Sequence, residues 1–389
     1  MDEKPTVQWL SSAEELPDAL WRESFPPEAE GGWWYRALDH SNLGDQFTFY
    51  YGLIACGDKA IGIAPVFVMN VPIDIVTPPA VTRVLLVAGK LRPSLRYQRT
   101  LFVGSPCADE GTVGLRPGVR LAEVSEELQD ALEALSVREH AKMIVWKDFP
   151  DAGVQELGGL IKARRMFTMP SYPSTVVHLP KGGFDDYLAT LDAGRRYSLR
   201  KKLKTSKAMG ALQSAVIQRP QDAELKEIFA LFMQTYTKGK TKFERLGFAF
   251  FEQIARCEES HFITLRAPET GRLVAFMLCF RGGRKVINKF IGLDYALDER
   301  WFMYFRLWEA AVIWAMVIGA DEIQSGQTVY RAKLDIGHQL VPLTNVCLNR
   351  NWFFHRLFAA VARTVSWSTL DADLKLRAEA QARKGQAKG

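Results

Sequence analysis

Three polar side chains follow an expected strand near residue 323, namely Tyr330, Arg331 and Lys333. When an amine attacks an acyl carbonyl, a fixed cation or hydroxyl beside the carbonyl oxygen stabilises the oxyanion that forms. The pattern therefore indicates acyl transfer, and the alternative is that Lys333 is an ordinary lysine at the end of a strand. We expect Tyr330 and Lys333 to take part in catalysis and Arg331 to bind substrate.

An attacking ammonium must first lose a proton, and Asp294, Glu309 and His338 are candidates for the base. His338 needs the smallest change, because the ordinary pKa of histidine lies close to neutral pH. Glu309 stands three residues after Arg306 on an expected helix, so these two side chains can also form a simple ion pair. The polar residues expected to line the substrate site are Asn288, Tyr295 and Gln327.

A dense basic run precedes these residues, and its positions 196, 200 and 204 share one face of an expected helix. Arginine offers a bidentate fork to phosphate, so this run predicts a site for a phosphate-bearing co-substrate. The alternative is a solvated helix face. The residues expected to bind the co-substrate are Arg195, Arg196, Arg200, Lys201 and Lys289.

Length and composition favour a two-domain protein that works on anionic partners. The chain has 389 residues, a net charge of +6 and five cysteines. The cysteines are odd in number and none pair at metal-ligand spacing, so we expect a reducing compartment, no structural disulfides and no metal site. The N-terminus lacks the pattern of a signal peptide. We therefore expect a cytoplasmic protein.

The longest apolar run, residues 301–319, is interrupted by Arg306 and Glu309. A spanning helix would bury both charges in lipid, so a buried helix of a globular fold is the better interpretation. Residues 351–370 form a basic amphipathic pattern with several aromatic residues. Such a helix either docks on the domain or lies in a membrane interface, which would make the protein peripheral on the inner membrane.

Short strands and helices alternate in both halves of the chain. In the first half, a capping-box spacing at Ser11 and Glu14 predicts a helix start. The other elements expected there are helices at 33–38 and 121–140 and strands at 47–53, 61–68, 81–87 and 143–146. A segment with two prolines, residues 167–174, predicts a crossover between the halves.

The second half repeats this mixture. After a strand at 175–179 come helices at 185–193, along the basic run, at 223–236 and at 248–257. Three strands at 261–266, 273–280 and 285–291 are separated by short turns, which is typical of an antiparallel meander. The long apolar helix and the strand near residue 323 complete the order.

Four stretches of this half resemble the GNAT-like acyltransferases grouped with the Fem-type peptidyltransferases and the peptidoglycan biosynthesis/recognition proteins. They are LDAGRRYSLRKKLKTSKAMG, FALFMQTYTKGKTKFERLGFAFFEQIA, INKFIGLDYALDERWFMYFRLWEAAVIWAMVIGADEI and SGQTVYRAKLDIGHQLVPLTN. The first half resembles the family through GGWWYRAL and GIAPVFV, so the resemblance runs from about residue 5 to 344. In Fem-type enzymes the lysine that matches Lys333 acts on the developing oxyanion.

The resemblance implies an α/β (α+β) fold of tandem GNAT-like domains, with mixed, largely antiparallel sheets flanked by helices. Its expected boundaries are 1–168 for the N-terminal domain, 169–350 for the catalytic domain and 351–389 for the basic tail. The implied reaction is N-acyl transfer from acyl-CoA, a co-substrate and not a bound cofactor, to the amine of a lipid or amino-alcohol. Among the branches of this group, the chain resembles the bacterial ceramide synthases most.

Two alternatives stay open: an aminoacyl-tRNA-dependent Fem-type peptidyltransferase that acts on a cell-wall precursor, and a binding protein without catalysis. We expect no DNA partner, and tRNA only in the first alternative. The loop at 292–299 lacks the glycines with which acetyl-CoA enzymes hold pyrophosphate, and it carries three acids. Because the second half is rich in aromatic residues, an apolar groove for a long acyl chain is expected instead.

Overall fold

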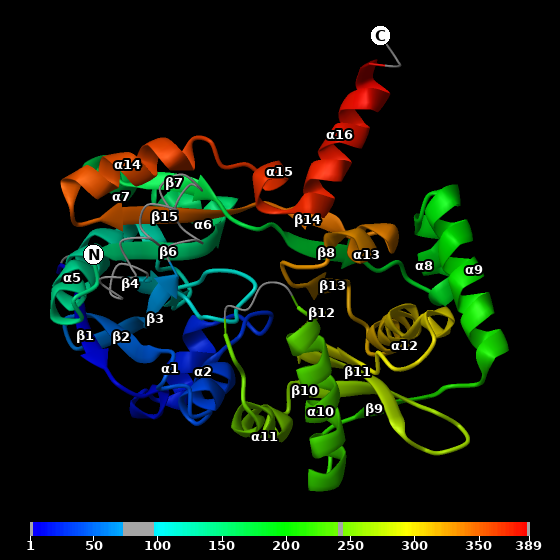
Figure 1. Cartoon of the computed structure of the whole chain (residues 1–389). Coiled ribbons are helices and arrows are strands. Elements are labelled where there is room, and N and C mark those ends of the chain that lie inside the picture. Colours follow the sequence, from blue (N-terminus) through cyan, green and yellow to red (C-terminus); the bar gives the residue numbers. More distant parts are fainter. Residues whose placement is uncertain (1–2, 73–96, 240–243, 387–389) are drawn as a thin grey trace, which may run out of the picture.

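The computed structural model describes residues 3–72, 97–239 and 244–386. Two sheets stand side by side, each flanked by helices (Figure 1). Elements of the first half are β1 (Thr6–Leu10), η1 (Ala13–Glu15), α1 (Asp18–Ser24), α2 (Gly32–Asp39), β2 (Thr48–Cys56), β3 (Lys59–Pro72), β4 (Tyr97–Val103), β5 (Gly114–Leu115), α5 (Leu121–Arg138), β6 (Met143–Pro150), α6 (Asp151–Glu156), α7 (Gly158–Ala163) and β7 (Phe167–Pro170).

The second half begins with β8 and continues through a similar series. Its elements are β8 (Ser174–His178), α8 (Phe184–Thr190), α9 (Ala193–Met209), β9 (Gln213–Ile217), α10 (Asp222–Lys238), α11 (Phe248–Arg256), β10 (Ser260–Arg266), β11 (Leu273–Gly282), β12 (Lys285–Leu293), η3 (Glu299–Trp301), α12 (Met303–Val317), β13 (Glu322–Ser325), α13 (Tyr330–Asp335), β14 (Gln339–Val341) and β15 (Leu343–Asn349). Helices α14 (Trp352–Ala362), α15 (Trp367–Leu370) and α16 (Ala372–Gln386) follow.

The two sheets share one topology. The first has the order β1-β2-β3-β4-β6-β15-β7, with β5 beside β3, and the second has the order β14-β8-β13-β12-β11-β10-β9. In each sheet four strands form an antiparallel meander, and the fourth then pairs in parallel with the next, β4 with β6 and β12 with β13. The predicted fold class, tandem α/β units with largely antiparallel sheets, is confirmed.

The halves exchange one strand each. The chain leaves the first sheet after β7 and enters the second sheet at β8, which lies between β13 and β14. At its other end it leaves the second sheet after β14, and β15 inserts between β6 and β7 of the first sheet. Neither sheet is therefore built from one continuous stretch of sequence.

Three apolar layers hold the sheets. One core lies between the halves and joins α1, α2, α10 and α11, where Trp34 packs edge-on against Phe250 and Phe280. An outer core of the first half includes α5 and α7 together with Val346 from β15. The outer core of the second half includes α12, α8 and α9. Aromatic burial at the middle layer fixes how the two halves meet, because large rings lose much apolar surface to water when separated.

Most predicted elements that fall on described residues are present, and two differ. The capping box at the start of the chain uses Ser12 and Glu15 instead of Ser11 and Glu14. The single helix expected at 351–370 is broken, because α14 ends at Ala362 and α15 starts at Trp367. The strand expected at 81–87 lies outside the described residues. Among the described helices, none has both the length and the apolar character needed to cross a bilayer.

Candidate functional site

A buried lysine, Lys289, lies in β12 directly after the last residue of that strand that pairs with β13. The pairing register shifts between Leu278 and Cys279, so that Lys289 is an extra residue in β12. Such a bulge turns a side chain out of the regular alternation. The Lys289 side chain is only 2% exposed, and its Nζ lies 2.6 Å from Glu30 Oε1 and 3.7 Å from Asp109 Oδ1. Burial alone would lower the pKa of Lys289, but the two carboxylates outweigh it and raise that pKa.

Asp109 reaches this site from the first half, in the segment between β4 and β5. Its Oδ1 lies so close to the backbone of β13 that a Cβ at Gly326 would come within 3.0 Å of it. The other oxygen, Oδ2, is buried without a hydrogen-bond partner among the described residues. A buried oxygen of this kind is costly unless something binds it, so it points to a ligand or to water at this position.

Lys333, like Asp109, lies beside Gly326. It lies on α13, and its Nζ donates a hydrogen bond to the Gly326 carbonyl. Burial lowers the pKa of Lys333 to about 8, and the charge of Asp109 opposes that shift. The helix starts from Val329, which has a left-handed backbone with φ 55°. That conformation is strained for a β-branched residue, and strain of this kind is concentrated at functional sites.

Ser325 and His338 form a second buried pair beside Lys333. His338 Nδ1 lies 3.2 Å from the Lys333 carbonyl, which can only accept, so Nδ1 carries the proton. Its Nε2 then accepts from the Ser325 hydroxyl at 3.0 Å, and Asn288 Nδ2 donates to the same hydroxyl oxygen at 3.3 Å. Burial and the nearby Lys333 lower the pKa of His338 to about 3. A neutral imidazole with a lowered pKa is a weak base, which makes His338 a positioning residue.

Further titratable groups from both halves lie near this site. Glu110 accepts a 2.9 Å hydrogen bond from Gln324 Nε2, and burial raises the pKa of Glu110. Burial likewise raises the pKa of Glu244 and, well above its ordinary value, that of the Cys107 thiol. The site is thus a closed polar cluster between the halves, which we call the junction cluster: Glu30, Asp109, Asn288, Lys289, Ser325, Gly326, Gln327, Lys333 and His338.

Three more predicted residues lie on or near α13. Gln327 belongs to the junction cluster, and its Nε2 is buried without a partner among the described residues. Tyr330 is fully buried and donates to the Pro173 carbonyl at 2.8 Å, so its hydroxyl already has an acceptor. Burial raises the pKa of Tyr330. Arg331 is exposed, and its backbone N–H donates to Asp373 of α16.

The remaining acidic candidates are engaged elsewhere. Asp294 forms an ion pair with Arg272, and its Oδ1 accepts from the backbone N–H of Ala296 at 3.0 Å. Glu309 pairs with Arg306 at 3.2 Å, the arrangement that their spacing suggested, and with Lys207 at 2.8 Å. Tyr295 is exposed beneath the ammonium of Lys238. None of these contacts joins them to the junction cluster.

The basic helix α9 covers the outer side of α12 (Figure 1). Arg195 pairs with Asp192 beside it, and Arg196 donates weakly to the Leu191 carbonyl. An exposed stripe runs along the other face and consists of Tyr197, Arg200, Lys201 and Lys204. Lys202 pairs with Asp335 at 3.8 Å, which ties α9 to the helix that carries Lys333.

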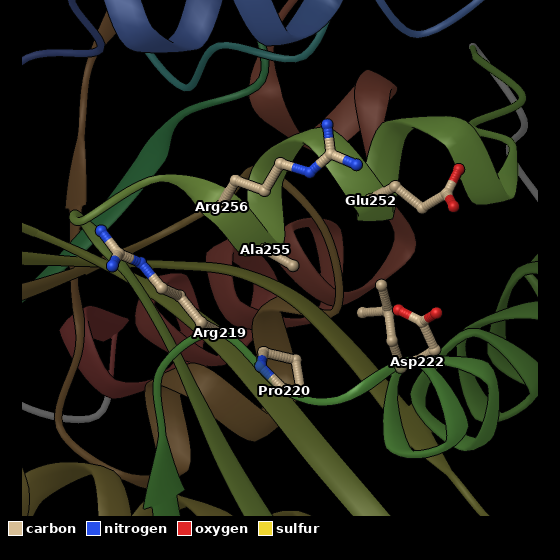
Figure 2. Close-up of a pocket in the computed structure, with 7 residues that line it drawn as sticks. Arg219, Pro220, Asp222, Glu252, Ala255 and Arg256 are labelled. Carbon is tan, nitrogen blue, oxygen red and sulfur yellow. The ribbon is translucent and has the colours of Figure 1, made fainter.

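Two surface hollows lie apart from this cluster. One, of about 350 Å³, is lined by Arg219, Asp222, Glu252 and Arg256 at the facing ends of α10 and α11 (Figure 2). The other, of about 550 Å³, adjoins it around Arg219, His261 and Arg281. Both mix positive and negative side chains, and neither includes a predicted site residue.

Sequence reasoning missed Glu30, Asp109 and Ser325. Asp109 and Glu110 follow a strand in the stretch GSPCADEG, and an acidic pair among small residues after a strand is a usable signal. Glu30 precedes a helix in a proline-rich turn and carries no comparable signal. Ser325 starts the quoted motif SGQTVYRAKLDIG, but its partner His338 stands thirteen residues away.

Comparison with known proteins agrees with this architecture. Residues 178–327 match the profile of the FemAB-like family, described as peptidoglycan biosynthesis/recognition. No curated protein sequence matches significantly. The crystal structure of FemX superposes with a TM-score of 0.57 at 10% identity, covering 83% of this chain and 93% of FemX. A conserved protein of unknown function from Bacteroides thetaiotaomicron VPI-5482 gives a TM-score of 0.54 at 12% identity, covering 88% of this chain and all of that one, 100%.

At such low identity the structural similarity shows the fold alone. None of these matches supports the narrower expectation of a ceramide synthase. The chain has a fold like that of FemX, and residues 178–327 of its second half match the FemAB-like family.

Proposed function

We propose that the protein is a transferase that moves an aminoacyl group from aminoacyl-tRNA to an amine on a cell-wall or lipid precursor. The observation that carries this proposal is the buried Lys333, held by the Gly326 carbonyl near Asp109, whose Oδ2 has no hydrogen-bond partner among the described residues. The description of the matching family, peptidoglycan biosynthesis/recognition, supplies the class of acceptor.

The reaction forms one bond and breaks another. The acceptor nitrogen attacks the ester carbonyl carbon, the C–O bond to the tRNA ribose breaks, and the proton lost by nitrogen ends on the leaving ribose oxygen. In this scheme Asp109 Oδ2 accepts a hydrogen bond from the attacking amine, since it has no other partner among the described residues. The Lys333 ammonium stabilises the oxyanion, because a fixed charge in a dry site acts more strongly than in water.

Two features favour tRNA over coenzyme A as the donor. In the loop where acetyl-CoA enzymes hold pyrophosphate, Asp294 and Asp298 already accept from the backbone N–H groups of Ala296 and Arg300. The exposed stripe of α9 instead offers three cations beside an exposed tyrosine. Positive charge with an aromatic ring suits a nucleic acid backbone and its bases.

The apolar groove expected for a long acyl chain has less support. Phe276, Met277 and Trp308 are completely buried and pack within the cores. Long-chain acyl-CoA is therefore the alternative donor that the experiment below compares with aminoacyl-tRNA.

A donor series tests the proposal directly. The purified protein receives labelled aminoacyl-tRNA or acyl-CoA from acetyl to palmitoyl, with a UDP-linked muramyl peptide, an aminolipid or a sphingoid base as acceptor. We expect a mass increase of one aminoacyl group, only with aminoacyl-tRNA, and abolished by ribonuclease treatment of the donor. Turnover only with acyl-CoA, rising with chain length, would overturn the tRNA proposal. Saturable acceptor binding without turnover by any donor would indicate a binding protein.

A further inference from the structure

An aromatic surface is exposed on α14, which packs on the first sheet. Trp352 is 70% exposed and Phe353 is 62% exposed, and both stand in the first turn of the helix. Phe354 beside them is 39% exposed. Large aromatic side chains in contact with water cost free energy, and clustered ones mark an interaction surface.

The helix itself is firmly attached to the first half. Its inner residues Phe358 and Ala362 are buried, and Phe358 packs with Met143, Val145 and Cys347 of the first sheet. At its start, the side chain of Asn351 caps two backbone N–H groups, and His355 contacts the Arg165 carbonyl at 3.0 Å. Figure 1 shows α14 lying along the outside of β15 and β7. The aromatic residues are therefore presented outward by a rigid helix.

Positive charge surrounds these aromatic residues. Arg356 lies over the Trp352 ring, at 5.3 Å from its centroid, and Arg363 is exposed further along the helix. The backbone N–H of Arg350 donates to the Lys142 carbonyl, and the ring Nε2 of His355 contacts the Arg165 carbonyl, so Arg350, Lys142 and Arg165 lie near the base of the helix. The stretch from residue 350 to 370 contains no aspartate or glutamate.

We propose that this surface, formed by Trp352, Phe353, Arg356 and Arg363, docks the protein on an anionic lipid bilayer. Tryptophan and phenylalanine rings bury in the interface between headgroups and acyl chains, while arginines pair with lipid phosphates. A protein partner of acidic character would need directional contacts, whereas a flat rigid helix with outward rings and a basic rim fits a lipid surface. The inference is independent of the transfer reaction.

Vesicle sedimentation of the full chain tests it. One vesicle is phosphatidylcholine alone, and the other contains phosphatidylglycerol as well. We expect binding to the anionic vesicle that weakens as salt rises, because screening reduces the attraction of arginine to the headgroups. Trp352→Ser combined with Phe353→Ser is expected to lower the binding constant about tenfold or more, and Arg356→Gln with Arg363→Gln to abolish the preference for phosphatidylglycerol.

The matched control replaces exposed apolar residues elsewhere. Val317 and Ile313 on α12 are 80% and 45% exposed, so Val317→Ser with Ile313→Ser removes similar exposed surface without touching α14. We expect wild-type binding from this control, and unchanged thermal midpoints for all variants. Undiminished binding of the Trp352 and Phe353 variant would overturn the proposal. So would a wild-type dimer in light scattering that the same variant loses, because a second copy would then cover the surface.

Discussion

Each half contains one pair of parallel strands. The two pairs have the same topology, but the polar side chains beyond the point where the strands separate have different partners. In the first half, β4 and β6 part after Val103 and Trp146, and in the second half β12 and β13 part after Asn288 and Ser325. Beyond the first pair, Lys147 binds Asp148, whose other oxygen accepts from the Ser171 hydroxyl. The polar side chains beyond this strand pair therefore bind one another.

In the second half, the charged side chain beyond the parallel strand pair is bound by residues of the first half. Lys289 finds its carboxylates, Glu30 and Asp109, on the first half, while Asp109 Oδ2 and Gln327 Nε2 keep free hydrogen-bonding capacity among the described residues. The difference teaches that two repeats of one topology can differ in where their buried charges find partners, within the same half or on the other half. A catalytic unit confined to residues 169–350 would lack those carboxylates.

The largest effect should come from the exchanged strand. Val346 of β15 is completely buried in the outer core of the first half. Val346→Asp buries a carboxylate with no partner, and we expect the free energy of unfolding to fall by at least about 3 kcal/mol. Hydrogen exchange should accelerate in β6 and β7 before β12 and β13. Val216→Asp, at an exposed position of β9, serves as control. Equal loss of protection in both sheets would argue against separate units.

Lys333 and Lys147 provide a direct contrast between the halves. Lys333→Met should lower kcat about 100-fold with little change in KM, because the charge acts on the transition state. Lys147→Met should change kcat less than about threefold, since Lys147 forms an ion pair with Asp148 in the first half. Steady-state rates of aminoacyl transfer check both. A rise confined to KM in Lys333→Met would reassign the residue to substrate binding.

The pH profile should separate Lys333 from the acceptor amine. Since the pKa of Lys333 lies at about 8, its charge is lost as pH rises through that value, and kcat should fall there. Deprotonation of the acceptor amine acts in the opposite direction and raises the rate with pH. Lys333→Arg stays protonated throughout, so its lower rate should show no alkaline decline near pH 8. A decline that persists in Lys333→Arg would belong to another group.

The folded protein should respond to pH in the opposite sense. A lysine with a lowered pKa binds fewer protons when folded than when unfolded, so between about pH 8 and its ordinary value near 10.4 this group makes stability rise with pH. Comparison of urea unfolding for wild type and Lys333→Met across this range isolates the contribution. A steeper rise in the variant would contradict the assignment.

The smallest effect concerns α9, which precedes the meander of the second half. Arg200→Ala with Lys204→Ala should raise the KM for aminoacyl-tRNA several-fold and weaken its salt dependence, since fewer phosphate contacts remain. Arg120→Ala, an exposed arginine at the start of α5, is the matched change in the first half and should leave both unchanged. Identical salt dependence in wild type and the α9 variant would leave these residues as solvated surface.

Local pattern was enough to predict β8, β10, β11, β12 and β13 of the second sheet, but only β2, β3 and β6 of the first. The continuous apolar run of β11 and the periodic helix α5 are specified by residues close in sequence. The strand exchange was not predictable in this way, because the residues of β8 do not show which sheet the strand joins, and β15 was not among the predicted strands. Lys333, Asn288 and Gln327 were proposed as site residues from chemistry and resemblance, whereas Asp109 and Glu30 needed the packing of one half on the other. Asp294 and Glu309 are local ion pairs, which sequence spacing alone cannot distinguish from a base.

The exchange also bears on how the chain is made. The backbone N–H of Asp148 in the first sheet is satisfied by the side chain of Asn345, a residue 197 positions further along the chain. During synthesis the first sheet must therefore wait, with the β6 and β7 edges unpaired, until nearly the whole second half has left the ribosome. Such a delay exposes strand edges to aggregation and makes a long loop closure part of folding. Chaperone dependence of expression would be its cellular sign.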